Sequence, residues 1–420
     1  MAARRPEGVV LQRDGHRGQA LLTVFTCDDV SYLRSQSGDA ALAAVARLEL
    51  SDSTRIADIA AARARFGERA PLLVETTLLR RRAAAKLGEL GDVSGWLFTD
   101  EALQQATAAP VALHRASRLA GRVVHDATCS IGTELAALRG VAQWTIGSDI
   151  DPVRLAMARH NVGAAQVLCR ADALHPVTRD AVVVLDPARR SSGPARVVRR
   201  LRPADYQPAL GPLLDAYRGR DVAVKCAPGI DFDEVERLGF DGEIEVTSYR
   251  GSVREACLWS GGLARLGVRR RASVLDRDEE VTSADSDDCP VRPAGRWIVD
   301  PDGAVVRAGL VRHYGARHGL WQLDPDIAYL SGDRLPPGVR GFEVIEQLAF
   351  DERRLRQALS AMDCGAVEIL VRGVRVDPDA LRRRLRLRGG AALSVVIARI
   401  GRSGAKGSSH PVAYVCRPSR

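Results

Sequence analysis

The fold is decided by residues 123–133, which read V-V-H-D-A-T-C-S-I-G-T. An apolar strand that begins Val123-Val124 runs into small residues and then into a helix. Small residues at such a turn let a ligand lie against the backbone at the carboxyl edge of a parallel sheet. The dinucleotide fingerprint G-x-G-x-x-G needs three glycines and only Gly132 is present, so a nicotinamide or flavin enzyme is disfavoured.

Further short apolar runs follow the first strand and alternate with helical stretches. They are Trp144-Thr145-Ile146, Val167-Leu168, Val182-Val183-Val184-Leu185 and Val222-Ala223-Val224. This alternation is typical of a parallel sheet with helices on both faces, so we expect an α/β, Rossmann-like fold. Two later strands, 243–248 and 255–259, are separated by a turn-prone stretch and predict a closing hairpin.

Acidic residues stand at the ends of four predicted strands: Asp126, Asp149, Asp172 and Asp186. The first three are spaced by 23 residues each. Carboxyl ends of parallel strands meet at one edge of a sheet, and a carboxylate at the tip of the second strand, Asp149, can accept both hydroxyl protons of a ribose. The alternative is that each aspartate is an exposed helix cap.

The strand end at Asp126 and the small-residue turn after it resemble the first motif of class I methyltransferases. The resemblance implies S-adenosylmethionine as cofactor, with Asp126 at its amino acid end and Asp172 at the adenine amino group. Ser130 stands where many of these enzymes have glycine. The further candidates for cofactor binding are Thr128, Ser130, Gly132 and Ala173.

The fourth strand ends in the tetrad D-P-A-R, residues 186–189. A D-P-P-x tetrad at this place binds the target base in methyltransferases that act on planar bases, so Asp186 and Pro187 are candidates to orient the acceptor and to fix the loop. Lys225 is a rare lysine at the same edge and the third catalytic candidate. It either contacts a phosphate or the base, or simply reaches solvent.

Cys226 offers a different chemistry. Pyrimidine C5-methyltransferases of the uridine type pair a D-P-P-R motif with a nucleophilic cysteine near proline, and residues 225–231, K-C-A-P-G-I-D, are partly similar. A thiolate that adds to C6 of the base would activate C5 for methyl transfer. The alternative is a buried cysteine that acts as a small hydrophobic side chain.

The chain divides into four predicted parts. Three- and four-residue spacing of apolar side chains predicts a helical N-terminal domain, 1–109, before the methyltransferase domain, 110–268. The acidic segment Asp276 to Pro290 is expected to be an exposed loop within a linker and connecting segment, 269–340. Strands at 342–345, 367–371 and 393–398 and helices at 351–362 and 377–384 predict a small α+β domain, 341–420. Asp151-Pro152 and Asp377-Pro378 should each open a helix as cap and first-turn proline.

These motifs, with L-F-T at 97–99 and Q-A-T at 105–107, resemble a bacterial family of class I methyltransferases with a THUMP-like C-terminal domain. Residues 368–373, 377–378 and 385–389 resemble that ferredoxin-like domain. THUMP domains proper bind RNA, so the resemblance implies methylation of a base in RNA, either tRNA or rRNA. The alternative is a non-catalytic RNA-binding protein on the same scaffold.

Composition agrees with a nucleic-acid partner. The net charge is +9, and basic surfaces gain affinity for polyanions by displacing counterions. Lys86, Lys225 and Lys406 are the only lysines, so the arginine bias is alternatively a matter of codon composition. We expect no metal and no disulfide framework, because the eight cysteines are scattered. Without a long apolar run or a signal sequence, we expect no membrane partner and a cytoplasmic location.

Overall fold

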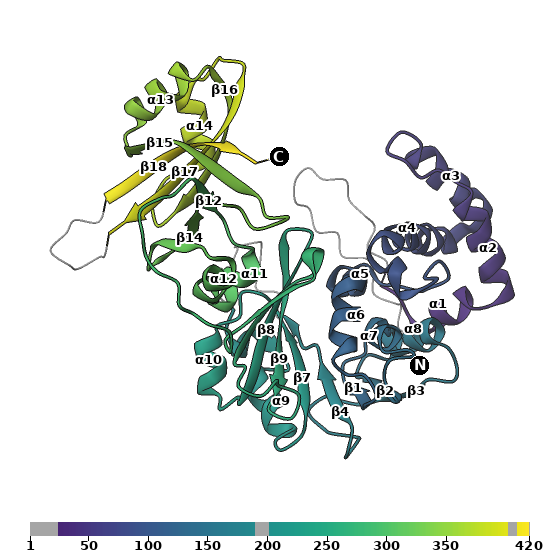
Figure 1. Ribbon diagram of the computed structural model, residues 1–420. Helices are drawn as coiled ribbons and strands as arrows, with labels where there is room; N and C mark the ends of the chain where they lie inside the picture. The colour runs from purple at the N-terminus through teal and green to yellow at the C-terminus, as the bar shows by residue number, and fades with distance from the viewer. Residues whose placement is uncertain (1–23, 190–200, 402–409, 420) are drawn as a thin grey trace.

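The computed structural model of the chain describes residues 24–189, 201–401 and 410–419. In Figure 1, helices of the N-terminal part lie at the upper right and a nine-stranded sheet lies below them. A seven-stranded sheet formed by the C-terminal part lies at the upper left. The mixed α/β class expected from the sequence is confirmed.

The nine-stranded sheet has the order β11-β10-β8-β9-β7-β4-β1-β2-β3. Its strands are β1 Val123–Asp126, β2 Trp144–Asp149, β3 Val167–Arg170, β4 Val182–Leu185, β7 Val222–Cys226, β8 Gly242–Tyr249, β9 Ser252–Ser260, β10 Arg270–Val274 and β11 Glu279–Thr282. Strands β7, β4, β1, β2 and β3 run parallel to one another. Strand β9 runs antiparallel to both β7 and β8, and its pairing with β8 confirms the predicted hairpin. The chain passes from β1 out to β3 and returns to β4, so a topological switch point lies between β1 and β4, where ligands bind in such sheets.

Helices follow the first two strands of the sheet. α7 Thr133–Ala137 follows β1, and α8 Pro152–Val162 follows β2. The Asp151 carboxylate accepts hydrogen bonds from the backbone N–H groups of Val153 at 2.8 Å and Arg154 at 3.2 Å, so the predicted cap is confirmed.

The N-terminal helices share a hydrophobic core with the helices of the sheet. They are α1 Cys27–Leu33, α2 Gln36–Ala46, α3 Arg55–Phe66, α4 Ala70–Leu87, α5 Asp100–Gln105 and α6 Ala109–Ser117, with short 3-10 turns η1 Gly67–Arg69 and η2 Gly88–Leu90. The core of α1 to α5 includes Ile131, Ala136 and Met157 from around α7 and α8. Helix α6 packs through Ala112 and Ala116 in a separate cluster with the strands of the sheet. The Asn161 side chain of α8 also forms two hydrogen bonds with the backbone of Leu97. Its Oδ1 accepts from the Leu97 N–H at 2.8 Å, and its Nδ2 donates to the Leu97 carbonyl at 3.0 Å. These helices therefore form one wall of the sheet domain.

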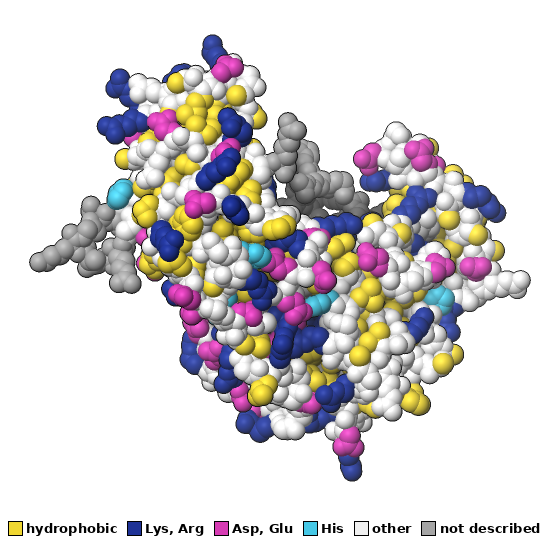
Figure 2. Space-filling view, in the orientation of Figure 1, with side chains coloured by type: hydrophobic (Ala, Val, Ile, Leu, Met, Phe, Trp, Pro, Cys, Tyr) yellow, Lys and Arg dark blue, Asp and Glu magenta, His cyan; other side chains and the backbone are white. Residues whose placement is uncertain are grey.

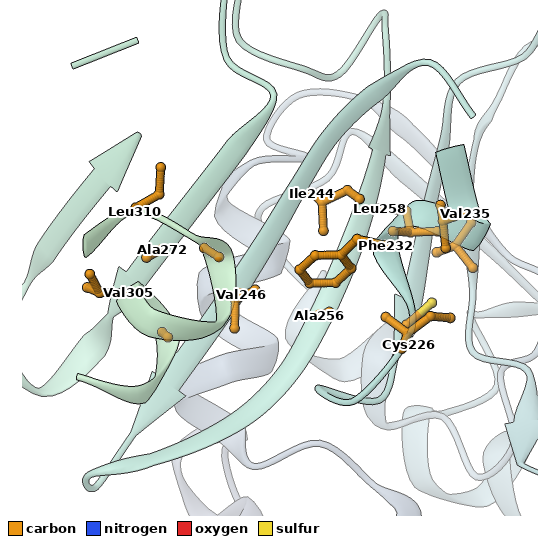
Figure 3. Close-up of a cluster of buried hydrophobic side chains, with 14 of the residues drawn as sticks. Cys226, Phe232, Val235, Ile244, Val246, Ala256, Leu258, Ala272, Val305 and Leu310 are labelled. Carbon is orange, nitrogen blue, oxygen red and sulfur yellow. The ribbon is translucent and has the colours of Figure 1, made fainter. Parts of the chain in front are cut away.

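The half of the sheet formed by β7 to β10 has one apolar face. Side chains such as Ile244, Val246 and Leu258 pack there against Phe232 and Val305 (Figure 3). The covering helices are α9 Leu210–Ala216, α10 Phe232–Arg237 and α11 Gly303–Ala308; nearby lie η3 Pro203–Asp205, η4 Leu275–Arg277 and the two-stranded sheet of β5 Ala188–Arg189 and β6 Tyr206–Gln207.

The segment expected to be an exposed loop differs from the prediction. Residues of β11, within Asp276 to Pro290, pair antiparallel with β10 and extend the sheet. Val281 is fully buried, while Glu280 on the opposite face pairs with Arg271 at 2.5 Å. The prediction was wrong for β11, because its Glu280 is neutralised by a cation on the neighbouring strand, which composition does not reveal. Residues 283–290 lie outside helices and strands and are mostly exposed, as expected.

The second sheet has the order β13-β14-β12-β15-β18-β17-β16. Its elements are β12 Trp297–Val299, α12 Val311–His318, β13 Trp321–Asp324, β14 Ile327–Gly332, β15 Gly341–Ala349, α13 Glu352–Ala361, β16 Cys364–Arg372, α14 Pro378–Leu385, β17 Ala391–Ile400 and β18 His410–Pro418. Asp377 caps α14 as predicted. The sheet takes β12 to β14 from residues before 341, and the proposed limits of the domains remain a prediction.

Candidate active site

A cavity of about 390 Å³ lies at the carboxyl ends of the parallel strands. It is lined by the four strand-end carboxylates, Asp126, Asp149, Asp172 and Asp186, and by Lys225. The structure therefore brings together side chains that are up to 99 residues apart in the sequence. Its position is the switch point between β1 and β4.

The other candidates divide into two groups. Thr128, Ser130 and Ala173 line the cavity, whereas Gly132 and Pro187 do not. Gly132 precedes α7 with a φ of +88°, and a Cβ atom there would lie 2.7 Å from Cγ1 of Val162. Gly132 thus shapes the turn. Pro187, the residue after Asp186, is buried.

Asp126 is a buried carboxylate with little compensation. Its side chain is only 2% exposed and accepts one long hydrogen bond, from the Thr128 N–H at 3.3 Å. Burial raises the pKa of Asp126 well above its usual range, and the neighbouring carboxylates, Glu134 first, raise it further. A cation in the cavity would relieve this repulsion.

Asp149 holds the turn after β1. Its two carboxylate oxygens accept the backbone N–H groups of Ser130 and Asp151, both at 2.8 Å. Ser130 has a φ of +48°, the left-handed region that favours glycine, so the hydrogen bond to Asp149 offsets the strain of serine at this position. Each Asp149 oxygen keeps a lone pair for a ligand.

Asp172 lies at the outer part of the cavity. Its carboxylate accepts the Leu174 N–H at 2.9 Å and lies 3.7 Å from the exposed ring of His175. The neighbouring Ile150, after β2, lines the cavity with 59% of its surface exposed. An exposed aliphatic side chain at a cavity mouth can pack against a flat apolar ring.

Asp186 and Lys225 form an ion pair at the end of the cavity next to β4 and β7. The Lys225 Nζ lies 2.5 Å from Oδ2 of Asp186, and the two side chains are 15% and 43% exposed. The Asp186 N–H donates to the Thr128 hydroxyl at 2.6 Å. The predicted catalytic pair is thus tied to the turn after β1.

A buried charge network escaped the sequence analysis. Arg115 of α6 binds both oxygens of Glu134 and also contacts Glu255 of β9, and its side chain is 2% exposed. Thr107 donates to the second oxygen of Glu255 at 3.4 Å. Glu134, Arg115 and Thr107 line the cavity. No local motif marks these residues, because their partners are 19 to 148 residues away.

The N-terminal helices contribute a wall of the cavity. Gln105, Ala106 and Thr107 line it after the end of α5. They belong to the Q-A-T stretch that the resemblance had already marked. Gln207, the last residue of β6, and the following Pro208 also line the cavity.

Cys226 lies outside the cavity lining and within the hydrophobic core (Figure 3). Burial raises the pKa of the Cys226 thiol far above its usual range, and the charge of Asp186 adds to this effect. The burial of Cys226 outside the cavity lining agrees with the role of a small hydrophobic side chain rather than with that of a nucleophile.

The cavity fits a cationic nucleotide-like cofactor. Five carboxylates line it against three cations, Arg115, Arg154 and Lys225, and each of these cations is already paired with a carboxylate. Asp126 and Asp149 have no basic partner within the described residues. The sulfonium and ammonium groups of S-adenosylmethionine would supply the missing positive charge near Asp126, and Asp149 could accept the ribose hydroxyls.

Two further properties concern the described part of the chain alone. It contains no cluster of three or more side chains suited to a metal ion. None of its helices is long and apolar enough to cross a membrane.

Comparison with known proteins places this cavity in context. Residues 339–418 match the family of THUMP domain-like modules. Two proteins of Mycobacterium tuberculosis, from strains CDC 1551 and H37Rv, are 77% identical over 364 residues, which is 85% of this chain and the whole of each relative; both bear the name uncharacterized S-adenosylmethionine-dependent methyltransferase. The crystal structure of a candidate methyltransferase from Porphyromonas gingivalis W83 shares the fold, with a TM-score of 0.70 at 19% identity, over 91% of this chain and 99% of the other. The chain belongs to the S-adenosylmethionine-dependent methyltransferases and carries a THUMP-like C-terminal domain.

Proposed function

We propose that the chain methylates RNA, in tRNA or rRNA. The supporting observation is the distribution of charge. Residues 339–418 contain 15 Lys and Arg against 8 Asp and Glu, a net charge of +7 out of the +9 of the whole chain. The basic charge is therefore concentrated in the THUMP-like domain, where an overall codon bias would have spread it evenly.

Arginines on the outer helices of this domain are available for phosphates. Helices α13 and α14 bury Leu355, Leu359, Leu381 and Leu385 against the sheet and expose their other faces. Figure 2 shows basic side chains that stand out around these helices. On α13, on α14 and within three residues after α14, six exposed arginines form no ion pair within the described part of the chain: Arg353, Arg354, Arg356, Arg383, Arg386 and Arg388.

The cavity supports the following division of roles. Asp126, with the turn of Thr128, Ser130 and Gly132, holds the amino acid end of S-adenosylmethionine, Asp149 the ribose, and Asp172 with Ala173 the adenine. The bound cofactor supplies a methyl group on a sulfonium. The neutral thioether that remains leaves without acid catalysis. Asp186 and Lys225, with Pro187 fixing the loop, position the acceptor in line with that methyl group, and positioning is the main source of acceleration.

RNA binding tests the substrate. Filter binding of tRNA and rRNA fragments between about 50 and 200 mM salt should show a steep salt dependence, because each phosphate contact releases counterions. Replacing the six arginines by glutamine should lower the slope of log K against log salt by up to about 4, at roughly 0.7 for each contact. The control is Arg296→Gln with Arg417→Gln, whose guanidinium groups pair with Glu343 at 3.0 and 3.5 Å. An unchanged slope in the sixfold variant contradicts the proposal.

A further inference from the structure

The acceptor end of the cavity provides no aromatic surface for a base. The described residues that line it include no Phe, Tyr, Trp or His. Residues 190–200, which follow the D-P-A-R tetrad in the sequence, contain no aromatic residue either. Enzymes that modify an extruded base hold it by stacking between aromatic or apolar side chains. A sugar, in contrast, needs hydrogen bonds and not a stacking platform.

Charged groups gather instead at this end. The register that pairs Leu185 with Val224 puts Asp186 beside Lys225 on neighbouring strands, in agreement with their 2.5 Å contact. Lys225 in turn lies opposite Cys257, so Glu255, two residues from Cys257, is on the same face. Lys225 therefore lies between the Asp186 carboxylate at the cavity and the buried Glu255 carboxylate.

Lys86 of α4 contacts α5, the helix that leads into the Q-A-T part of the cavity lining. Its Nζ donates to the carbonyl oxygens of Leu103 at 2.7 Å and Gln104 at 2.9 Å, at the end of α5. Burial, followed by the charge of Lys225, lowers the pKa of Lys86 to about 8. Lys86 thus fixes the backbone that carries Gln105 and Thr107 into the cavity.

The Asp186–Lys225 pair fits a hydroxyl better than a base nitrogen. An ammonium group only donates hydrogen bonds, and a carboxylate only accepts them. A hydroxyl can accept from Lys225 and donate to Asp186 at the same time. An exocyclic amine can donate to Asp186 but offers Lys225 no good acceptor, while an unprotonated ring nitrogen can accept from Lys225 but is repelled by the carboxylate.

We propose that the methyl acceptor is a ribose 2′-hydroxyl, a choice that rests on the proposed RNA substrate. The acceptor oxygen bonds to the methyl carbon as the bond from that carbon to the sulfonium sulfur breaks, and the sulfur keeps that electron pair. The hydroxyl proton passes to a carboxylate oxygen of Asp186, which becomes a neutral acid. Lys225 holds the acceptor oxygen and the Asp186 carboxylate, and Lys86 is a positioning residue.

The position of the methyl group decides the question. RNA from cells that lack the gene is incubated with the full chain and S-adenosylmethionine, digested to nucleosides and analysed by mass spectrometry. The expected product carries the methyl group on the sugar fragment, whereas a methyl group on the base fragment overturns the inference but leaves the RNA proposal intact. No methylation of any RNA by protein that binds the cofactor contradicts both.

A second arm uses the substrate itself. Once the modified nucleotide is located, an RNA with a single 2′-deoxy sugar at that position should bind with unchanged affinity and accept no methyl group. Methylation of the deoxy RNA overturns the inference, because the acceptor oxygen is missing.

Variants test the roles of the pair. Asp186→Asn should lower methyl transfer at least about 100-fold, as expected for loss of a proton acceptor. Lys225→Gln should lower it comparably, whereas cofactor affinity measured by calorimetry should stay within about threefold for both. Lys86→Gln should raise KM for RNA more than it lowers kcat. The control is Arg122→Gln, at the opposite edge of the sheet, and wild-type activity of Asp186→Asn refutes the role of Asp186.

Discussion

Replacing Arg115 by methionine tests the buried charge network most directly. Methionine keeps the length and the apolar stem of the side chain, but it leaves Glu134 and Glu255 without their cation. Breaking a buried ion pair by removing one partner costs about 3–5 kcal/mol, since the remaining charge stays desolvated. That loss is a large share of the roughly 5–15 kcal/mol that stabilises a typical domain.

Urea unfolding followed by tryptophan fluorescence measures the loss. Trp259 is fully buried in β9, the strand that also carries Glu255, and it reports on this domain. With an m-value of about 3 kcal/mol/M, the midpoint should fall by about 1–1.7 M. Arg82→Met is the matched control, because Arg82 pairs with Asp100 at 2.6 Å with a side chain that is 53% exposed, and such pairs contribute about 0.2–1 kcal/mol.

The double replacement separates charge from packing. Adding Glu255→Gln to Arg115→Met removes one uncompensated carboxylate, so part of the lost stability should return. If Arg115→Met costs no more than Arg82→Met, or if the second replacement lowers stability further by its full single-mutant cost, the network does not hold the wall of the cavity as argued.

Three further outcomes follow from the site. Because burial and the neighbouring carboxylates raise the pKa of Asp126, the cationic cofactor should lower that pKa on binding and release protons, so cofactor affinity should rise with pH through the raised pKa. Calorimetry in buffers of different ionisation enthalpy measures the proton release, which should vanish in Asp126→Asn; release that persists in this variant would contradict the role of Asp126. Gly132→Ala should raise the cofactor Kd at least about tenfold, through the left-handed φ and the clash with Val162, whereas Gly95→Ala, with open space at its Cβ, should not. Cys226→Ala should keep methyl transfer within about threefold in a labelled-methyl assay, and a loss of about 100-fold would restore the thiolate mechanism.

The sequence allowed the sheet and its acidic edge to be predicted because both depend on local patterns. Apolar runs gave five parallel strands, and each ended within two residues of a carboxylate or Lys225. Capping followed from single dipeptides, as Asp151-Pro152 and Asp377-Pro378 show. Strand ends and caps are determined by neighbours along the chain, so one sequence suffices for them.

The parts that escaped prediction depend on distant partners. β11 looked like an acidic loop until Arg271 was seen to neutralise Glu280. Arg115 looked like any other arginine, although it is the most buried cation of the cavity wall. β18 pairs between β15 and β17, and its place in the middle of the sheet cannot be inferred from its own residues. Spacing in sequence carries no information on such pairings.

The separation of charge between the two sheets has a physical reason if the substrate is RNA. The cavity must be acidic to hold a sulfonium, and its five carboxylates repel the phosphates of any RNA that approaches. Affinity for the polyanion must then come from a surface beyond the roughly 8 Å screening length at physiological salt. The THUMP-like domain, with +7 of the +9 charges, is such a surface. Replacing Asp126 or Asp149 by asparagine should therefore strengthen RNA binding while it weakens cofactor binding, whereas the arginine variants should weaken RNA binding and leave cofactor binding unchanged.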